Sequence, residues 1–124
     1  MTNQASELYE LCKEVYKRTG WKPDYREVKK FDRDGGIVTQ EFLYNNDHTP
    51  LYTSDYLLEK LPSTIKNEFD GDDDYLILYK KSGSWYADYM GQFIRCESDT
   101  PLKALLKLTI ALSEAGELKY DLSS

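Results

Sequence analysis

The sequence predicts an α+β domain in which a largely antiparallel sheet of four to five strands carries its N- and C-terminal helices on one face. Three observations predict this fold. Apolar stripes at helical spacing lie near both ends of the chain, runs of β-favouring residues lie between them, and a short helix-like segment interrupts those runs. With 124 residues, 40% of them apolar, residues 1–124 are expected to form a single domain with one core.

The C-terminal stripe is the best-marked helix. Asp99 or Thr100 can cap its first turn, and Pro101 suits the first helical position because its missing N–H would have no partner there. The leucine spacing predicts one broad buried stripe that leaves Lys103 in water. Gly116 supplies the left-handed residue with which many helices end, so both ends of this helix are specified by the sequence.

Two further helices are expected earlier in the chain. Residues 4–19 carry an apolar stripe with charged residues outside it, and residues 55–61 form a short helix that Pro62 stops. Residues 45–50 read as a polar loop. Residues 63–69 read either as one more helical turn or as irregular chain.

Strands fill the rest of the sequence. Residues 25–31 and 37–44 are separated by turn chemistry and predict a hairpin. Residues 75–79 are apolar on both faces, which indicates a central strand. A Ser-Gly-Ser turn then leads into a strand at 85–90, and residues 93–96 suggest one more short strand.

The charge of the chain argues against some partners. A formal net charge of −6 disfavours a generic nucleic-acid binder, whose affinity comes mainly from cationic contacts to phosphates. Residues 1–34 hold eight of the 16 basic and seven of the 22 acidic residues, so most excess acidity lies later in the chain. The sequence has neither a membrane-spanning apolar run nor a signal segment, which predicts a cytoplasmic protein without membrane contact.

The common catalytic signatures are missing from the sequence, and so are those of a bound cofactor. It contains no phosphate-binding GxxxxGK[ST] loop, no GxGxxG, no GxSxG and no HExxH. The one histidine, His48, is the only imidazole that could activate Cys12 or Cys96. The favoured interpretation is a solvated loop histidine and two inert free thiols, since buried cysteines are usually packing residues.

Two acidic segments, residues 32–36 and 70–74, invite a calcium interpretation. Neither has the ligand spacing of an EF-hand loop, so solvated turns are favoured. The functional alternative is a negative patch that meets a basic partner. Its residues would be Asp70, Asp72, Asp73 and Asp74.

The chain also has eleven tyrosines and two tryptophans, which suit a contact surface as well as a core edge. Alternation along residues 85–90 places Trp85 on one face, with Tyr86 and Met90 on the other. Helices can cover only one face, so Tyr86, Met90 and Tyr79 would form an exposed aromatic patch if the other is open. Simple packing among strand aromatics is the favoured alternative. The candidate binding residues of this region are Tyr79, Trp85, Tyr86 and Met90.

Four segments follow one another along the chain in this order: ELCKEVYKRTGW, LYTSDYLLEKLP, WYADYMG and SDTPLKALLKLTIALSEAG. In this order the chain resembles small uncharacterised proteins encoded by bacteriophages and prophages. The resemblance covers most of the chain and implies a phage accessory protein, without transferring any catalytic residue. Small acidic phage proteins often bind and block a host factor, including antiviral defence components such as CRISPR nucleases.

Three functions follow as hypotheses. The preferred one is a non-enzymatic binding protein that acts on a host protein through an acidic and aromatic surface. The second is a small-molecule sponge, in which aromatic rings stack a nucleotide base and Arg26, Arg33 or Arg95 holds its phosphate. The third is an enzyme that uses paired carboxylates or a metal ion. A homodimer is compatible with each, because an open sheet edge or face favours symmetric pairing.

Overall fold

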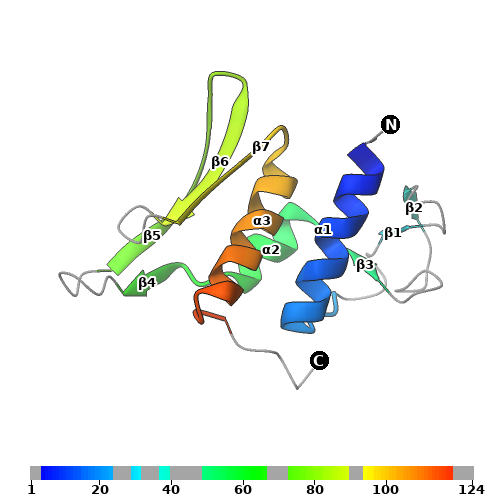
Figure 1. Ribbon diagram of the computed structural model, residues 1–124, viewed down its shortest axis with the longest axis horizontal. Coiled ribbons are helices and arrows are strands. Elements are labelled where there is room, and N and C mark those ends of the chain that lie inside the picture. Colours follow the sequence, from blue (N-terminus) through cyan, green and yellow to red (C-terminus); the bar gives the residue numbers. More distant parts are fainter. Residues whose placement is uncertain are drawn as a thin grey trace. The chain divides into compact units, whose positions relative to one another are not determined.

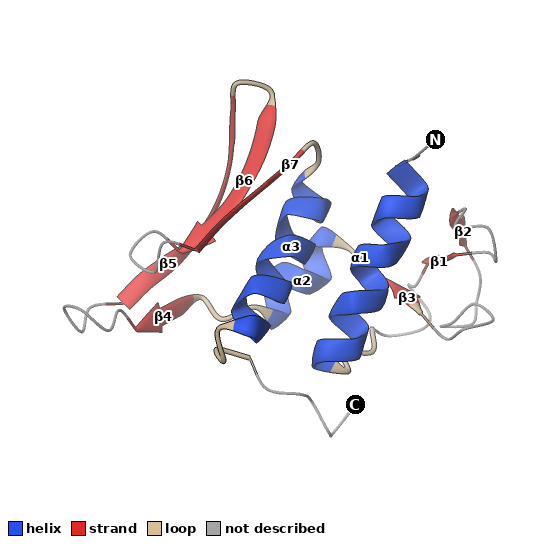
Figure 2. Cartoon of the chain, in the orientation of Figure 1, coloured by secondary structure: helices blue, strands red, loops and turns tan. Residues whose placement is uncertain are grey.

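The structure is a computed structural model that describes residues 4–23, 29–31, 37–39, 49–66, 73–89 and 94–118 (Figures 1 and 2). The chain divides into two compact units, one that reaches Thr53 and one from Ser54 to Leu118. Whether residues 1–124 fold as a single domain stays a prediction, since this division does not test whether either unit folds alone.

The first unit holds a long helix and a small sheet. Its elements are α1 (Gln4–Thr19), β1 (Lys29–Phe31), β2 (Ile37–Thr39) and β3 (Pro50–Leu51). The strands pair antiparallel in the order β2-β1-β3. The helix expected over residues 4–19 is therefore confirmed, and it ends at Gly20, whose positive φ of 70° suits glycine.

The expected first hairpin forms, but in this small sheet rather than in the larger one. Its third strand, β3, begins at Pro50, the last residue of the loop predicted over residues 45–50, so the prediction is wrong for Pro50. Residues 45–48 lie outside the described residues. A two-residue strand is too short to show alternation, and Pro50 fits only because edge positions tolerate a missing N–H. The interior of this unit is anchored by Tyr52, whose buried hydroxyl donates to the backbone oxygen of Trp21 at 2.8 Å.

The second unit contains the main sheet. Its elements are α2 (Ser54–Lys60), β4 (Thr64–Lys66), β5 (Asp73–Lys81), β6 (Ser84–Tyr89), β7 (Ile94–Ser98) and α3 (Pro101–Glu114). Four strands pair antiparallel in the order β4-β5-β6-β7. This confirms the α+β class, the four-stranded antiparallel sheet, the terminal helices and the short middle helix. The sequence predicts a helical turn or irregular chain over residues 63–69, but residues 64–66 form strand β4. Residues 67–69 lie outside the described residues.

A two-residue turn joins β5 to β6. Ser82 and Gly83 have φ angles of 54° and 82°, as a type I′ turn requires at both central positions. The turn aligns Lys81 with Ser84 and so fixes the register of the whole hairpin. Because successive side chains alternate between faces, this register decides which residues of β5 and β6 lie together.

Helix α3 covers one face of this sheet and packs on β6 and β7 (Figure 1). Thr100 caps it by accepting a hydrogen bond from the Lys103 N–H at 3.2 Å. Its other end is a Schellman closure, in which the Glu117 N–H donates to Leu112 at 2.9 Å around the left-handed Gly116. Both ends therefore form as the sequence predicts, with Thr100 as the cap.

One expectation for α3 is wrong. Lys103 is only 3% exposed instead of lying in water. Leu106 is fully buried too, although the stripe expected from Leu105, Leu108 and Leu112 does not include it. The Lys103 ammonium lies 3.0 Å from Oδ1 of Asp99, one turn earlier. Hydrogen bonding with Lys103 lowers the pKa of Asp99, so the carboxylate stays charged. A buried lysine is thus accommodated where the residue before the N-cap supplies an acid, which helical periodicity alone does not reveal.

Candidate functional site

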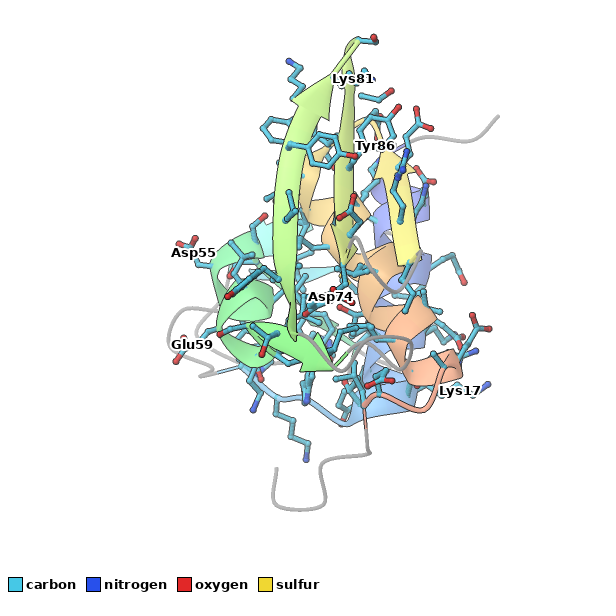
Figure 3. The ribbon with its side chains drawn as sticks, turned by 90° about the vertical axis from the view of Figure 1, so that its left-hand side faces the viewer. Lys17, Asp55, Glu59, Asp74, Lys81 and Tyr86 are labelled. Atoms are coloured by element: carbon cyan, nitrogen blue, oxygen red, sulfur yellow. The ribbon has the colours of Figure 1, made fainter. Side chains whose placement is uncertain are left out.

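The register of the main sheet brings polar and aromatic residues together on the face opposite α3. Tyr79 aligns with Tyr86, and Asp88 aligns with Ile77 on one side and Arg95 on the other. The buried residues Ala87 and Tyr89 alternate with these on β6 and lie on the α3 side. We call the opposite side the outer face, formed by Ile77, Tyr79, Tyr86, Asp88, Arg95 and Glu97. Figure 3 views this side of the unit, with Tyr86 and Lys81 labelled on the hairpin.

Two tyrosines form the aromatic part of the outer face. The rings of Tyr79 and Tyr86 are stacked, with centroids 5.2 Å apart and an angle of 14° between their planes. Both side chains are half-buried, so part of each ring remains open to contact. Aromatic cross-strand pairs stabilise a hairpin, by about 0.2–1 kcal/mol, and also fix their own orientation before any partner arrives.

Asp88 is the polar part of the outer face. Its side chain is only 4% exposed, and its Oδ2 lies 3.9 Å from Nε of Arg95, which is itself 65% exposed. Oδ1 is buried and accepts no hydrogen bond within the described part of the chain. A buried acceptor without a hydrogen bond is costly, so folding alone gives no reason to place a carboxylate here.

Asp88 also affects the neighbouring tyrosine. Burial, then the negative charge of Asp88 and a hydrogen bond between the Tyr79 and Asp88 side chains, raise the pKa of Tyr79, while the positive charge of Arg95 opposes the shift. The Tyr79 hydroxyl therefore stays neutral at physiological pH and remains a hydrogen-bond donor as well as an acceptor. The outer face thus offers a stacked ring pair, a phenol donor, an acid and an exposed guanidinium.

Of the four candidate residues chosen from this region of the sequence, two lie together here, one lies on the other face and one is not described. Tyr79 and Tyr86 form the stack. Trp85 lies on the α3 side of the sheet, where the Lys80 ammonium is 5.8 Å from its ring centroid. Met90 lies outside the described residues. The open aromatic patch is therefore built from the two tyrosines, without Trp85.

The acidic candidates are not gathered on the outer face. Asp70 and Asp72 lie outside the described residues, and for Asp73 only the strand position is described. Asp74 is opposite Ile65 in β5, and alternation places it on the α3 side, away from Tyr79. The sequence predicts a turn at residues 70–74, but Asp73 and Asp74 are instead the first two residues of strand β5.

The acid that does lie beside the tyrosine pair is Asp88, which the sequence reasoning did not select as a site residue. Alternation had placed Asp88 on the face of Tyr86, but its alignment with Arg95 and its burial depend on strand register. The signal available in the sequence was the polar residue between two aromatics in WYADY. Only the fold shows that this residue is buried.

Other chemistry is sparse in the described part of the chain. No group of three or more His, Cys, Asp and Glu residues there could hold a metal ion. Burial raises the pKa of Cys12 to about 12, and it also raises the pKa of the half-buried Cys96. None of the described helices combines the length and the apolar character that crossing a membrane requires.

Comparison with known proteins adds no relative. The sequence matches no protein-family model, and neither curated proteins nor solved structures show a significant match to it. Arguments about function therefore depend on the outer face itself.

Proposed function

We propose that this chain is a non-enzymatic accessory protein of phage type that binds and modulates a host protein in the bacterial cytoplasm. An antiviral defence component is the kind of target that such proteins block. The outer face is the proposed contact surface. One observation carries the proposal: a stacked tyrosine pair lies beside a buried carboxylate whose Oδ1 has no hydrogen bond in the described residues.

The chemistry of this face suits a protein partner with a basic, partly apolar surface. Tyrosine rings contribute rigid apolar area with a polar end, which is why they are enriched in interface cores. The Asp88 carboxylate and the net charge of −6 favour a positively charged partner and would accelerate its association. The acidic run at Asp70, Asp72, Asp73 and Asp74 stays a separate prediction for the same kind of partner.

Affinity capture tests the proposal. Tagged protein is incubated with bacterial lysate, and the bound proteins are identified and quantified by mass spectrometry. The wild type is compared with the double variant Tyr79→Ala/Tyr86→Ala and with a control, Leu58→Ala, which removes a 39% exposed side chain from α2. We expect one host protein to be captured in stoichiometric amount by the wild type and the control, and lost in the double variant.

Equal capture by all three proteins would show that the tyrosine pair is not the contact surface. Circular dichroism checks that the double variant still folds, which we expect because the two rings are only half-buried.

Small-molecule sequestration is a second candidate, favoured by one observation. Arg95 lies on the same face as the ring pair and is 65% exposed. A nucleotide base could stack on a tyrosine while the guanidinium holds a phosphate. Heat-denatured protein from the same capture would then release a nucleotide, and Arg95→Ala would abolish that release. Absence of any released ligand together with a captured protein would leave the first proposal in place.

A further inference from the structure

Strand β5 has an open edge that the proposed contact with a host protein does not use. The strand runs over nine residues, but β4 pairs only with its first three, Asp73–Tyr75. The Leu76 N–H donates to the backbone oxygen of Ser63 at 3.0 Å. The backbone N–H and C=O groups of Leu76 are therefore directed toward the β4 side of the strand. Because these directions alternate along a strand, Leu78 and Lys80 point theirs the same way. Neither has a strand partner on that edge within the described residues.

The opposite edge of the sheet differs. On β7, the outward backbone oxygen of Glu97 accepts a hydrogen bond from the Lys107 ammonium at 3.1 Å. Part of that edge is therefore occupied by a side chain from α3, which is one way in which proteins protect an edge strand. The β5 edge beyond Leu76 has no such cover from the described residues, so it is the more accessible edge of the sheet.

We infer that a second copy of this chain pairs with the β5 edge, antiparallel and centred on Tyr79. In this register Leu78 lies opposite Lys80 of the second copy, and the two-fold axis repeats the pair. Four backbone hydrogen bonds then use all four outward groups of Leu78 and Lys80. A register centred on Leu78 would need the Leu76 N–H, which already donates to Ser63. A register centred on Lys80 would oppose the two lysines and align Leu78 with the turn residue Ser82, whose φ is 54°. Of these three registers, only the one centred on Tyr79 leaves β4 in place and uses all four outward groups.

The side chains are compatible with this pairing. On the outer face, the two copies of Tyr79 become neighbours and extend the stack with Tyr86 into a row of four rings. On the other face, Lys80 lies opposite Leu78 of the second copy, so like charges are not directly opposed.

Charge complementarity supports a second copy as the occupant. The pairing places Lys81 of the second copy opposite Ile77, which itself aligns with Asp88. Two strand spacings of about 4.8 Å separate the backbones of that lysine and Asp88, a distance that their two side chains can span. The lysine would thus bring a positive charge to the carboxylate whose Oδ1 lacks a hydrogen bond in the described chain.

Sedimentation equilibrium of the full chain tests the inference. We expect the wild type to reach twice its 14.5 kDa mass as concentration rises. Lys80→Pro removes an N–H that only the dimer uses, so this variant should remain monomeric with an unchanged circular dichroism spectrum. Glu97→Pro is the matched control, because it removes an outward N–H from β7, and it should dimerise like the wild type.

A wild type that is monomeric at every concentration, or a Lys80→Pro variant that dimerises like the wild type, would overturn the inference. Charge substitutions at Ile77 test the register without proline. Ile77→Glu should tighten the dimer and Ile77→Lys should weaken it, by up to about fivefold at each of two symmetric pairs. The stability of the monomer should follow the opposite order, with Ile77→Glu less stable than Ile77→Lys, because residue 77 neighbours the acidic Asp88. Dissociation constants for which Glu gives the weaker dimer would refute the pairing.

Discussion

Replacing Asp88 with Asn should stabilise the fold, because the native carboxylate is poorly satisfied. A buried acceptor without a hydrogen bond costs about 1–3 kcal/mol, and a buried charge adds to this cost. The compensating ion pair is weak: Arg95 is 65% exposed and its Nε is 3.9 Å away, so solvent limits the pair to at most about 1 kcal/mol. Asn has the same shape and removes the charge, but it keeps one buried acceptor and adds an NH2 group, so only the cost of burying the charge is recovered. We therefore expect Asp88→Asn to raise the free energy of unfolding by about 1 kcal/mol.

Urea denaturation at neutral pH, followed by circular dichroism, measures this change. Glu97→Gln is the control, since it removes an exposed charge from the same face and should change the free energy of unfolding by less than about 0.5 kcal/mol. The same Asn variant should bind a captured partner less tightly. A variant that is less stable than the wild type by 1 kcal/mol or more would show that Asp88 is a structural residue and would refute the reasoning.

Three further predictions concern the fold. Burial raises the pKa of Tyr89 to about 12, above the value of about 10 in an unfolded chain, so its contribution to stability is present below pH 10 and is lost between pH 10 and 12. In urea unfolding at several pH values, Tyr89→Phe should therefore lose less stability over that window, and an unchanged slope would contradict this. Cys12 should not react with a thiol reagent at pH 8 until guanidinium unfolds the protein, because its pKa is about 12; rapid native labelling mapped to Cys12 by peptide analysis would be contrary evidence. Gly83→Ala should cost about 1–2 kcal/mol in thermal unfolding because φ is +82°, whereas Ser82→Asn, which makes an Asn-Gly turn, should not destabilise; equal losses would argue against the turn geometry.

Elements with strong local signals could be predicted from the sequence. Helix α3 has a capping threonine, Pro101 in its first turn and Gly116 at its end, and these act through neighbouring residues only. The hairpin turn at Ser82 and Gly83 is equally local. Such features need no knowledge of the rest of the fold, which is why both ends of α3 agree with the prediction. The turn lies where it was predicted but is shorter, because Ser84 belongs to β6.

Short strands and unusual burial could not be predicted in this way. Strands β3 and β4 have two and three residues, too few for alternation to distinguish them from loop. Lys103 carries the charge of a surface residue, yet it is buried beside Asp99. Its position depends on what packs around α3, and helical spacing does not contain that information.

Only part of the candidate site could be predicted from the sequence, because some of its contacts depend on how the strands assemble. Tyr79 and Tyr86 are rings on adjacent strands, and their pairing follows once the turn between them is placed. Alternation along the strand already separates Trp85 from Tyr86 in the sequence, and the register confirms that the two residues lie on opposite faces. Asp88 gains its significance from burial and from Arg95 on a third strand, so only the assembled sheet shows it.

Site-specific photocrosslinking tests the central claim most directly. A photoreactive phenylalanine analogue is placed at Tyr86 on the outer face, or at Leu58 on α2 as the control, and the protein is irradiated in bacterial lysate. The account predicts that the Tyr86 probe crosslinks to the captured host protein and that the Leu58 probe does not. A host protein that is still captured, but crosslinks only from Leu58, would contradict the assignment of the outer face as the binding surface.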